Sequence, residues 1–223
     1  GTFIYGTLNR LLIRLGLHHI LNSVFWFQLG EYTYIKDGVE VVANGDLHRF
    51  FAGDKTAGVY MSGFYVVMMF GLPAMAFAIY LNTPKASRKK AGAILAGVAF
   101  TSFLTGITEP LEFLFLFVAP LLYVIHALLT GLALALAHML DIHAGFGFSA
   151  GFIDYLINYK LATNPLLILP LGLAFAIVYF LVSYYTIKIF KLKIFDTSTQ
   201  NSDSNTDEEA LSFIKALGGK ENI

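Results

Sequence analysis

Two carboxylates, Glu109 and Glu112, lie inside an apolar part of the sequence. An uncharged stretch precedes them at residues 91–107, and a second one follows at residues 113–139. A carboxylate at membrane depth is costly unless it faces a cavity or a partner, so a functional site is its first interpretation. Pro110 disfavours helical geometry at Glu109, and transporters often build a solute site from an acid at such a break. The alternative is an ordinary loop between two membrane helices, with both acids in the headgroup region.

Three side chains near the start of the chain could also do chemistry. The guanidinium of Arg10 is a rigid donor suited to sugar hydroxyls or phosphate, or alternatively to a lipid headgroup. His18 and His19 could donate hydrogen bonds or carry protons near neutral pH, unless they only end an interfacial helix. Neither an HExxH spacing nor a cysteine accompanies the histidines, so a metal site is not expected.

Other polar residues are more simply explained by structure. His126 and His138 lie in a predicted spanning helix, where a neighbouring backbone group or hydroxyl such as Thr130 would satisfy them. Asp154 is expected to pair with Lys160 or with the backbone of its own loop. The sequence contains neither a phosphate-binding P-loop nor a serine nucleophile elbow.

The composition indicates a membrane protein. Of the 223 residues, 57% are hydrophobic and 13% are charged, whereas a soluble domain has about 25% charged residues. Residues 57–81, 113–139 and 165–187 carry no charge, and each run exceeds the roughly 20 residues that cross a bilayer. The zero net charge gives no reason to expect nucleic acid. The absence of cysteine excludes disulfides, thiolate metal sites and a cysteine nucleophile from this sequence.

Shorter elements surround these runs. Residues 3–16 have leucines at helical spacing, which predicts an amphipathic helix at the membrane interface or lining a cavity. Residues 20–29 are too short to span and are interpreted as a re-entrant or interfacial segment. Residues 32–35 and 39–42 predict a β-hairpin, and Gly71-Leu72-Pro73 predicts a helix kink.

Basic residues define the topology. They cluster at Lys85, Arg88, Lys89 and Lys90, and again at Lys188, Lys191 and Lys193. Both clusters mark the cytoplasmic side, so an even number of crossings must separate them. Because the runs 113–139 and 165–187 are the stronger two of three segments, residues 91–107 should enter and return, with Glu109 at a re-entrant tip. The predicted fold is an all-α polytopic membrane protein with re-entrant hairpins, a small β-hairpin and a short soluble tail.

The character of the chain changes after residue 195. Residues 196–206 are polar and predict a flexible linker. Thr206-Asp-Glu-Glu209 is a capping box, and residues 207–223 have one apolar face, which predicts the first helix of a soluble domain. Gly1 stands where a methionine would begin a complete protein, and we therefore expect a piece of a longer chain.

Three motifs occur in a characteristic order: Gly16-Leu-His-His19, Gly53-Asp-Lys-Thr-Ala-Gly58 and Gly106-Ile-Thr-Glu-Pro-Leu-Glu-Phe113. With them the chain resembles the membrane (IIC) domain of the glucose superfamily of bacterial sugar phosphotransferase permeases. Residues 1–10 and 142–155 are most similar to its N-acetylglucosamine-specific members.

The resemblance implies a protein of the bacterial inner membrane that couples sugar import to phosphorylation of the 6-hydroxyl. The phosphoryl donor would be a phosphocysteine on a IIB domain, with no cofactor. Residues 207–223 would begin that IIB domain on the cytoplasmic side, and residues 1–195 would be the substrate-binding half of IIC. Family members form dimers through an N-terminal half that this sequence does not contain, so residues 1–223 alone are expected to be inactive. The expected partners are therefore the sugar, IIB, a second copy and membrane lipid, but no nucleic acid.

The resemblance also assigns roles to residues. Arg10, His18 and Glu109 match the family's sugar-binding residues, and Thr108 accompanies them in the motif. Glu109 would accept the hydroxyl proton and His18 would orient the hydroxyl. His19 and Glu112 would have supporting roles. Arg14 departs from the proline common in relatives. Two alternatives stay open: a facilitator that moves the sugar unmodified, and glucose as the substrate.

Overall fold

The computed structural model describes residues 1–192, 194 and 195. In chain order the helices are α1 (Thr2–Ile13), α2 (His18–Phe27), α3 (Gly45–Phe51), α4 (Ser62–Val66), η1 (π-helical, Val67–Gly71), α5 (Leu72–Asn82), α6 (Arg88–Thr105), α7 (Glu109–Leu116), α8 (Pro120–Met139), α9 (Phe152–Ile157), η2 (3-10, Pro165–Leu167) and α10 (Ile168–Ile189). Strands β1 (Glu31–Lys36) and β2 (Val39–Asn44) follow α2. Lys193, the predicted linker (196–206) and the predicted helix after it (207–223) lie outside the described residues.

Three stretches of helix are long and apolar enough to cross a membrane: Ser62–Asn82, Pro120–Met139 and Pro165–Ile189. They confirm a helix of spanning length in each predicted run. The second run differs in one respect, because its first residues belong to α7 and a new helix begins at Pro120. Ala119 leaves helical geometry at φ −136° and ψ 68°, as expected of a residue that precedes proline.

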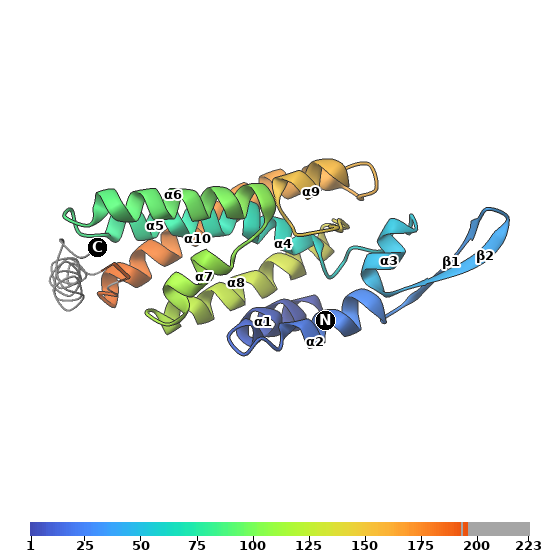
Figure 1. Ribbon diagram of the computed structural model, residues 1–223, viewed down its shortest axis with the longest axis horizontal. Coiled ribbons are helices and arrows are strands. Elements are labelled where there is room, and N and C mark those ends of the chain that lie inside the picture. Colours follow the sequence, from blue (N-terminus) through green and yellow to red (C-terminus); the bar gives the residue numbers. More distant parts are fainter. Residues whose placement is uncertain (193, 196–223) are drawn as a thin grey trace, which may run out of the picture.

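The predicted β-hairpin is confirmed, and it projects from the helical body (Figure 1). Lys36 pairs with Val39 across a two-residue turn. Asp37 and Gly38 both have positive φ, at 53° and 80°, which is the requirement of a type I′ turn. The predicted kink coincides with a change of helix type, since the π-helical turn η1 ends immediately before α5, whose first turn contains Pro73.

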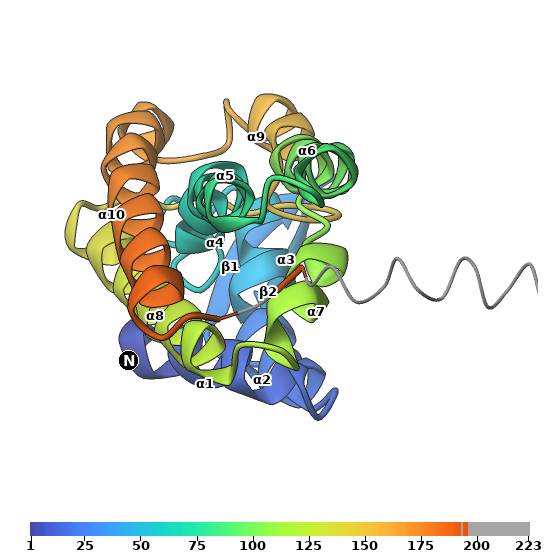
Figure 2. The same cartoon turned by 90° about the vertical axis from the view of Figure 1, so that its left-hand side faces the viewer.

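Helix α1 packs along α8, and α5 packs against α10 and α6 (Figure 2). Gly6 and Gly131 allow the first of these contacts. A Cβ atom on Gly131 would lie 2.1 Å from Thr7 Oγ1 and 2.5 Å from the Phe3 carbonyl oxygen. Small residues at such crossings let helix backbones approach closely in membranes.

Helix α1 turns its polar side inward. Asn9 and Arg10 are buried, whereas Leu8 and Leu15, on or just beyond the helix, are exposed. The predicted amphipathic helix is therefore present, although it ends at Ile13 and not at Gly16. Of the two predicted environments, the inward polar face fits a helix that lines an internal site.

Helices α6 and α7 form a helical hairpin (Figure 1). Helix α6 has 18 residues and is about 27 Å long. Gly106, at φ 76°, ends it, and α7 then runs back toward the end where α6 began. Its re-entrant course in a membrane stays a prediction.

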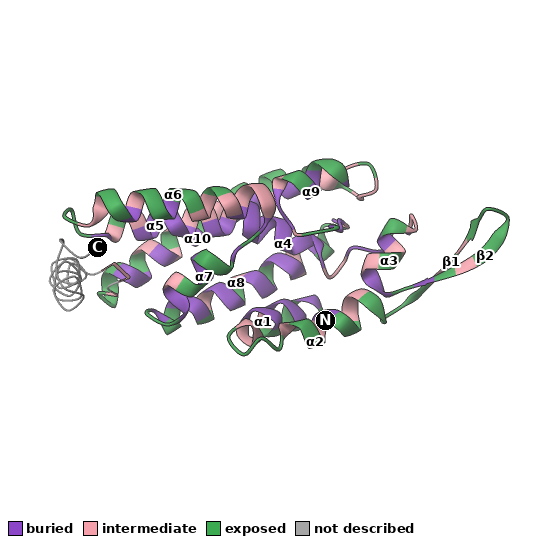
Figure 3. Cartoon of the chain, viewed as in Figure 1, coloured by how far each residue is buried: buried purple, intermediate pink, exposed green. Residues whose placement is uncertain are grey.

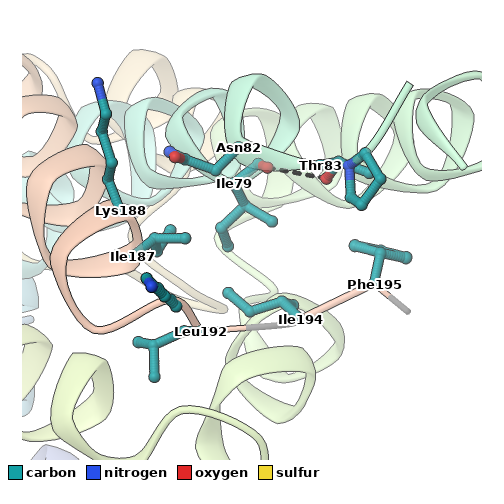
Figure 4. A pocket seen from close by; sticks show the side chains of 10 residues that line it. Ile79, Asn82, Thr83, Ile187, Lys188, Leu192, Ile194 and Phe195 are labelled. Atoms are coloured by element: carbon teal, nitrogen blue, oxygen red, sulfur yellow. Dashed lines mark hydrogen bonds between the residues drawn. The ribbon is translucent and has the colours of Figure 1, made fainter. Parts of the chain in front are cut away.

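The end of α5 and the end of α10 lie side by side (Figure 4). Between them is a cavity of about 350 Å³, lined by Ile79, Asn82, Thr83, Pro84, Ile187, Lys188, Lys191, Leu192, Ile194 and Phe195. The connection that carries Lys85 begins next to this cavity. The described residues of both basic clusters therefore lie at the same end of the molecule, as expected from the positions of the charges.

Buried residues lie mainly along α4, α5 and α8, while the β-hairpin and the outer sides of α6 and α10 are exposed (Figure 3).

Candidate functional site

The turn between α6 and α7 is held by packing that only glycine permits. Ser149 Oγ donates a hydrogen bond of 2.9 Å to the Gly106 carbonyl oxygen. A Cβ atom on Gly106 would lie 2.6 Å from Ser149 Oγ and 2.8 Å from the Gly151 nitrogen. On the α6 side, Ser102 Oγ donates a 2.7 Å bond to the Met68 carbonyl oxygen. These contacts fix the position at which α7 begins.

The break in the backbone lies before Glu109 and not at it. Gly106 to Thr108 are outside regular helix, and Glu109 is the first residue of α7. Pro110 lies in the first turn of that helix, where its missing N–H has no helical partner to lose. The prediction that Pro110 keeps Glu109 out of helical geometry is therefore wrong, because a proline in a first turn is compatible with the helix.

The two acids of α7 have different surroundings although they are one turn apart. Glu109 is exposed, and its Oε2 accepts a 3.1 Å hydrogen bond from the Thr108 N–H. Glu112 is fully buried, with 0% of its side chain exposed. A carboxylate that is buried this completely needs a cation and hydrogen bonds around it.

Arg10 supplies the positive charge. Its side chain is 3% exposed, and Nη1 lies 2.6 Å from Glu112 Oε1 and 3.4 Å from Thr108 Oγ1. The guanidinium carbon lies 5.1 Å from the centre of the Phe64 ring, within cation–π distance. The Tyr123 hydroxyl donates to the Arg10 carbonyl oxygen and ties this turn of α1 to α8.

Part of Arg10 is unsatisfied. Its Nε and Nη2 atoms are buried and have no hydrogen-bond partner among the described residues. They form the side edge of the guanidinium, a pair of parallel donors that fits two acceptor oxygens. Since buried donors without partners are rare and costly, this edge is suited to a ligand.

Glu112 also faces His126 of α8. His126 Nε2 lies 3.5 Å from Glu112 Oε1, and His126 Nδ1 lies 3.0 Å from the Tyr179 hydroxyl of α10. The prediction that a hydroxyl satisfies His126 is confirmed, but the hydroxyl belongs to Tyr179, while Thr130 donates to the His126 carbonyl oxygen. His138 is exposed in the last turn of α8.

The charges settle the ionisation of Glu112. Burial by itself would raise its pKa, but the adjacent Arg10 guanidinium, together with the His126 ring 3.5 Å from Oε1, outweighs burial. The pKa of Glu112 therefore lies well below its usual value, and the group is ionised.

His18 begins α2 beside this cluster. It is partly buried, and its Nδ1 atom has no hydrogen-bond partner among the described residues. Burial lowers the pKa of His18, and the charges of His19 and Arg10 lower it further, while Glu109 and Glu112 act in the opposite direction. His18 is thus neutral near pH 7, within electrostatic range of both acids. His19 is exposed, and its ring centre lies 3.9 Å from that of His18.

A buried amide holds α2 against α1. Asn22 Oδ1 accepts hydrogen bonds from the Tyr5 hydroxyl at 2.8 Å and from Asn9 Nδ2 at 2.6 Å. Asn22 is one turn after His18, and Asn9 adjoins Arg10. This contact therefore sets the position of His18 relative to Arg10.

The structure brings Arg10, Thr108 and Glu112 into contact and places Asp154 in the first turn of α9. Asp154 Oδ1 accepts a 2.7 Å bond from the Gly147 N–H, which confirms the prediction that it satisfies its own loop. Within residues 1–192, 194 and 195, no group of three or more acidic, histidine or cysteine side chains could hold a metal ion.

Three neighbours of the cluster were not predicted from the sequence: Phe64, Tyr123 and Tyr179. Each aromatic residue comes from an apolar helix; Phe64 and Tyr123 contact Arg10, and Tyr179 contacts His126. A tyrosine within such a run was the only signal, because its hydroxyl needs a partner when buried.

Residues 1–131 match the family model described as Phosphotransferase system, EIIC. The whole chain is 50% identical to the N-acetylglucosamine-specific EIICBA component of Klebsiella pneumoniae, of which it covers 36%. It is 49% identical over its whole length to the N-acetylglucosamine-specific EIICB component of Bacillus subtilis, covering 49% of that protein. Over 81% of its length it is 49% identical to the N-acetylglucosamine-specific EIIC component of Streptomyces coelicolor, covering 42% of it. The chain thus spans less than half of each relative.

Proposed function

This chain belongs to the phosphotransferase system EIIC family, and we propose that it binds N-acetylglucosamine and positions it for phosphorylation during import. The observation that carries the proposal is the Nε and Nη2 edge of Arg10, which is buried near His18 and the α7 acids and has no hydrogen-bond partner in the described part of the chain. Two parallel donors match two neighbouring oxygens of a sugar. The substrate is taken from three relatives that are each about half identical to this chain and named for N-acetylglucosamine.

Glu109 is the proposed general base. It is exposed at the start of α7, and no cation pairs with it among the described residues. As the 6-hydroxyl oxygen attacks phosphorus, Glu109 takes the hydroxyl proton, the P–S bond of the IIB phosphocysteine breaks and a thiolate leaves. Neutral His18 orients the hydroxyl by a hydrogen bond, and Arg10 and Thr108 hold the sugar. His19 supports His18 from the adjacent position.

The tail belongs to the same proposal. The relatives named EIICBA and EIICB align with the whole chain, whereas the relative named EIIC aligns with 81% of it. This difference supports residues 196–206 as a linker and residues 207–223 as the start of a IIB domain on the cytoplasmic side. We also retain the re-entrant course of α6 and α7 and assembly as a dimer. Residues 1–223 without added IIB should not phosphorylate sugar.

Phosphorylation of the sugar by the full-length protein tests the proposal. Membranes containing it would be supplied with phosphorylated IIB and labelled N-acetylglucosamine, with glucose as competitor. We expect N-acetylglucosamine 6-phosphate from the wild type and from Glu40→Gln, a control on the exposed strand β2, but little from Glu109→Gln. Wild-type turnover by Glu109→Gln would refute the base assignment. Uptake of unmodified sugar would favour a facilitator, and stronger competition by glucose would refute the substrate.

A further inference from the structure

We infer that Glu112, held by His126 and Tyr179, positions Arg10 on the sugar and keeps its charge away from Glu109. The inference rests on the function proposed above. It assigns different roles to two acids one turn apart on α7. Glu109 accepts the proton, and Glu112 orients Arg10.

The first step is the orientation of Arg10. Glu112 binds only Nη1, at 2.6 Å, so the opposite edge of the guanidinium keeps two donors that no described residue accepts. Phe64 packs on the face of the guanidinium, and Tyr123 holds the backbone of the same residue. Contacts at one nitrogen, one face and the backbone leave one edge for a ligand.

The second step concerns the choice between carboxylates. Glu109 and Glu112 are three residues apart on a helix, so both lie on neighbouring positions of its surface. A buried guanidinium without a partner is strongly unfavourable, and it would turn to the nearest anion. If Glu112 lost its charge, that anion would be Glu109, and an ion pair would occupy the oxygen that must accept the proton.

The third step concerns the contacts that hold Glu112 in place. In the tautomer with hydrogen on Nε2, His126 directs that N–H toward Glu112 Oε1, 3.5 Å away, and its Nδ1 accepts from the Tyr179 hydroxyl at 3.0 Å. Both rings are fully buried. The Tyr179 ring fits against Gly71, where a Cβ atom would lie 2.8 Å from it. Helices α7, α8 and α10 thus contribute one residue each to a series of contacts that ends at Arg10.

A purely stabilising role is the alternative, and kinetics distinguish the two. The acidic limb of the kcat/KM profile reports ionisation of the free base. In Glu112→Gln, Arg10 would pair with Glu109, stabilise its ionised form and move that limb to lower pH, with a fall in kcat. A loss of folding stability alone would lower the amount of active protein and leave the limb in place.

Tyr179 and His126, which do not contact Arg10 themselves, give the second readout. Tyr179→Phe removes one hydrogen bond and should raise KM for the sugar about fivefold, with kcat near the wild-type value. His126→Leu should raise KM at least as much, whereas His126→Gln, which keeps a donor in the position of Nε2, should raise it less. Ser183→Ala is the matched control, because it removes another buried hydroxyl from α10 and should leave KM unchanged.

The experiment uses full-length protein, phosphorylated IIB and N-acetylglucosamine, with activities divided by the amount of folded protein in the membrane. An unchanged KM in Tyr179→Phe together with an unmoved acidic limb in Glu112→Gln would overturn the inference. The proposed function would then still stand if the wild type phosphorylated the sugar and Glu109→Gln did not. A wild type without phosphorylation would overturn both. If His126→Leu did not fold, Tyr179→Phe and Glu112→Gln would decide the matter.

Discussion

Gly106 offers a measurement of how tightly the α6–α7 turn is held. At φ 76° an alanine would be strained by about 1–2 kcal/mol, the usual cost of the left-handed region for a residue with a Cβ atom. Its Cβ would also lie 2.6 Å from Ser149 Oγ, 2.8 Å from the Gly151 nitrogen and 2.9 Å from the Ala150 nitrogen. Such overpacking costs about 1–3 kcal/mol, so Gly106→Ala should lower the free energy of unfolding by about 3 kcal/mol in total.

Gly38→Ala is the control that separates strain from collision. Gly38 has φ 80°, but no atom of the described residues lies within 4 Å of the position its Cβ would take. It should therefore lose about 1–2 kcal/mol, from strain alone. Equilibrium unfolding of both variants would be measured in detergent, and sugar phosphorylation would be measured in parallel. Only Gly106→Ala should lose activity, because it displaces Glu109.

Equal losses of stability in the two variants would refute the argument for tight packing. Ser149→Gly provides a second check in the Gly106→Ala background. It removes the nearest atom, but two backbone nitrogens stay within 3 Å, so it should restore little stability. Full restoration would mean that the backbone of residues 150 and 151 is free to move.

Two further predictions concern α2. The pKa of His18 is lowered by burial from its ordinary 6.5, so the folded state resists its protonation; stability should be unaffected by His18 above pH 6.5 and should fall as the pH drops below that value. Between pH 6.5 and pH 5 the melting temperature of His18→Gln should therefore fall less than that of the wild type. Parallel curves of melting temperature against pH would contradict this. Asn22→Ala should cost about 1–3 kcal/mol, because the buried donors of Tyr5 and Asn9 lose their shared acceptor, and it should raise KM by loosening α2. Ser23→Ala, on the exposed side of the same helix, should change neither the melting temperature nor KM.

The elements that could be predicted are those with local signals. Asp37-Gly38 determines the turn of the β-hairpin, and the length of each uncharged run determines a spanning helix. Pro120 also carried a signal for the start of α8, but the continuous apolar run after Phe113 concealed it. Local signals of this kind do not require knowledge of how helices pack.

The cluster around Arg10 could be predicted only in part. The cost of an intramembrane acid pointed to α7, and the motifs added Arg10 and His18. Spacing could not show which acid is buried, because that depends on where α1 places a guanidinium that is 102 positions away in sequence. Tyr179 was unpredictable for a related reason: α10 is apolar on all sides, so its sequence does not indicate which face turns inward.

The contact between Gly6 and Gly131 restricts how the site can move. Backbones this close cannot slide past each other by one helical turn, because any side chain entering the contact would force α1 and α8 apart. Arg10 joins α7 to the same pair through Glu112, and Tyr123 joins α1 to α8. If the protein carries its solute across the membrane, we expect these three helices to move together. The sliding surfaces and hinges of that motion then lie outside the α1–α8 contact.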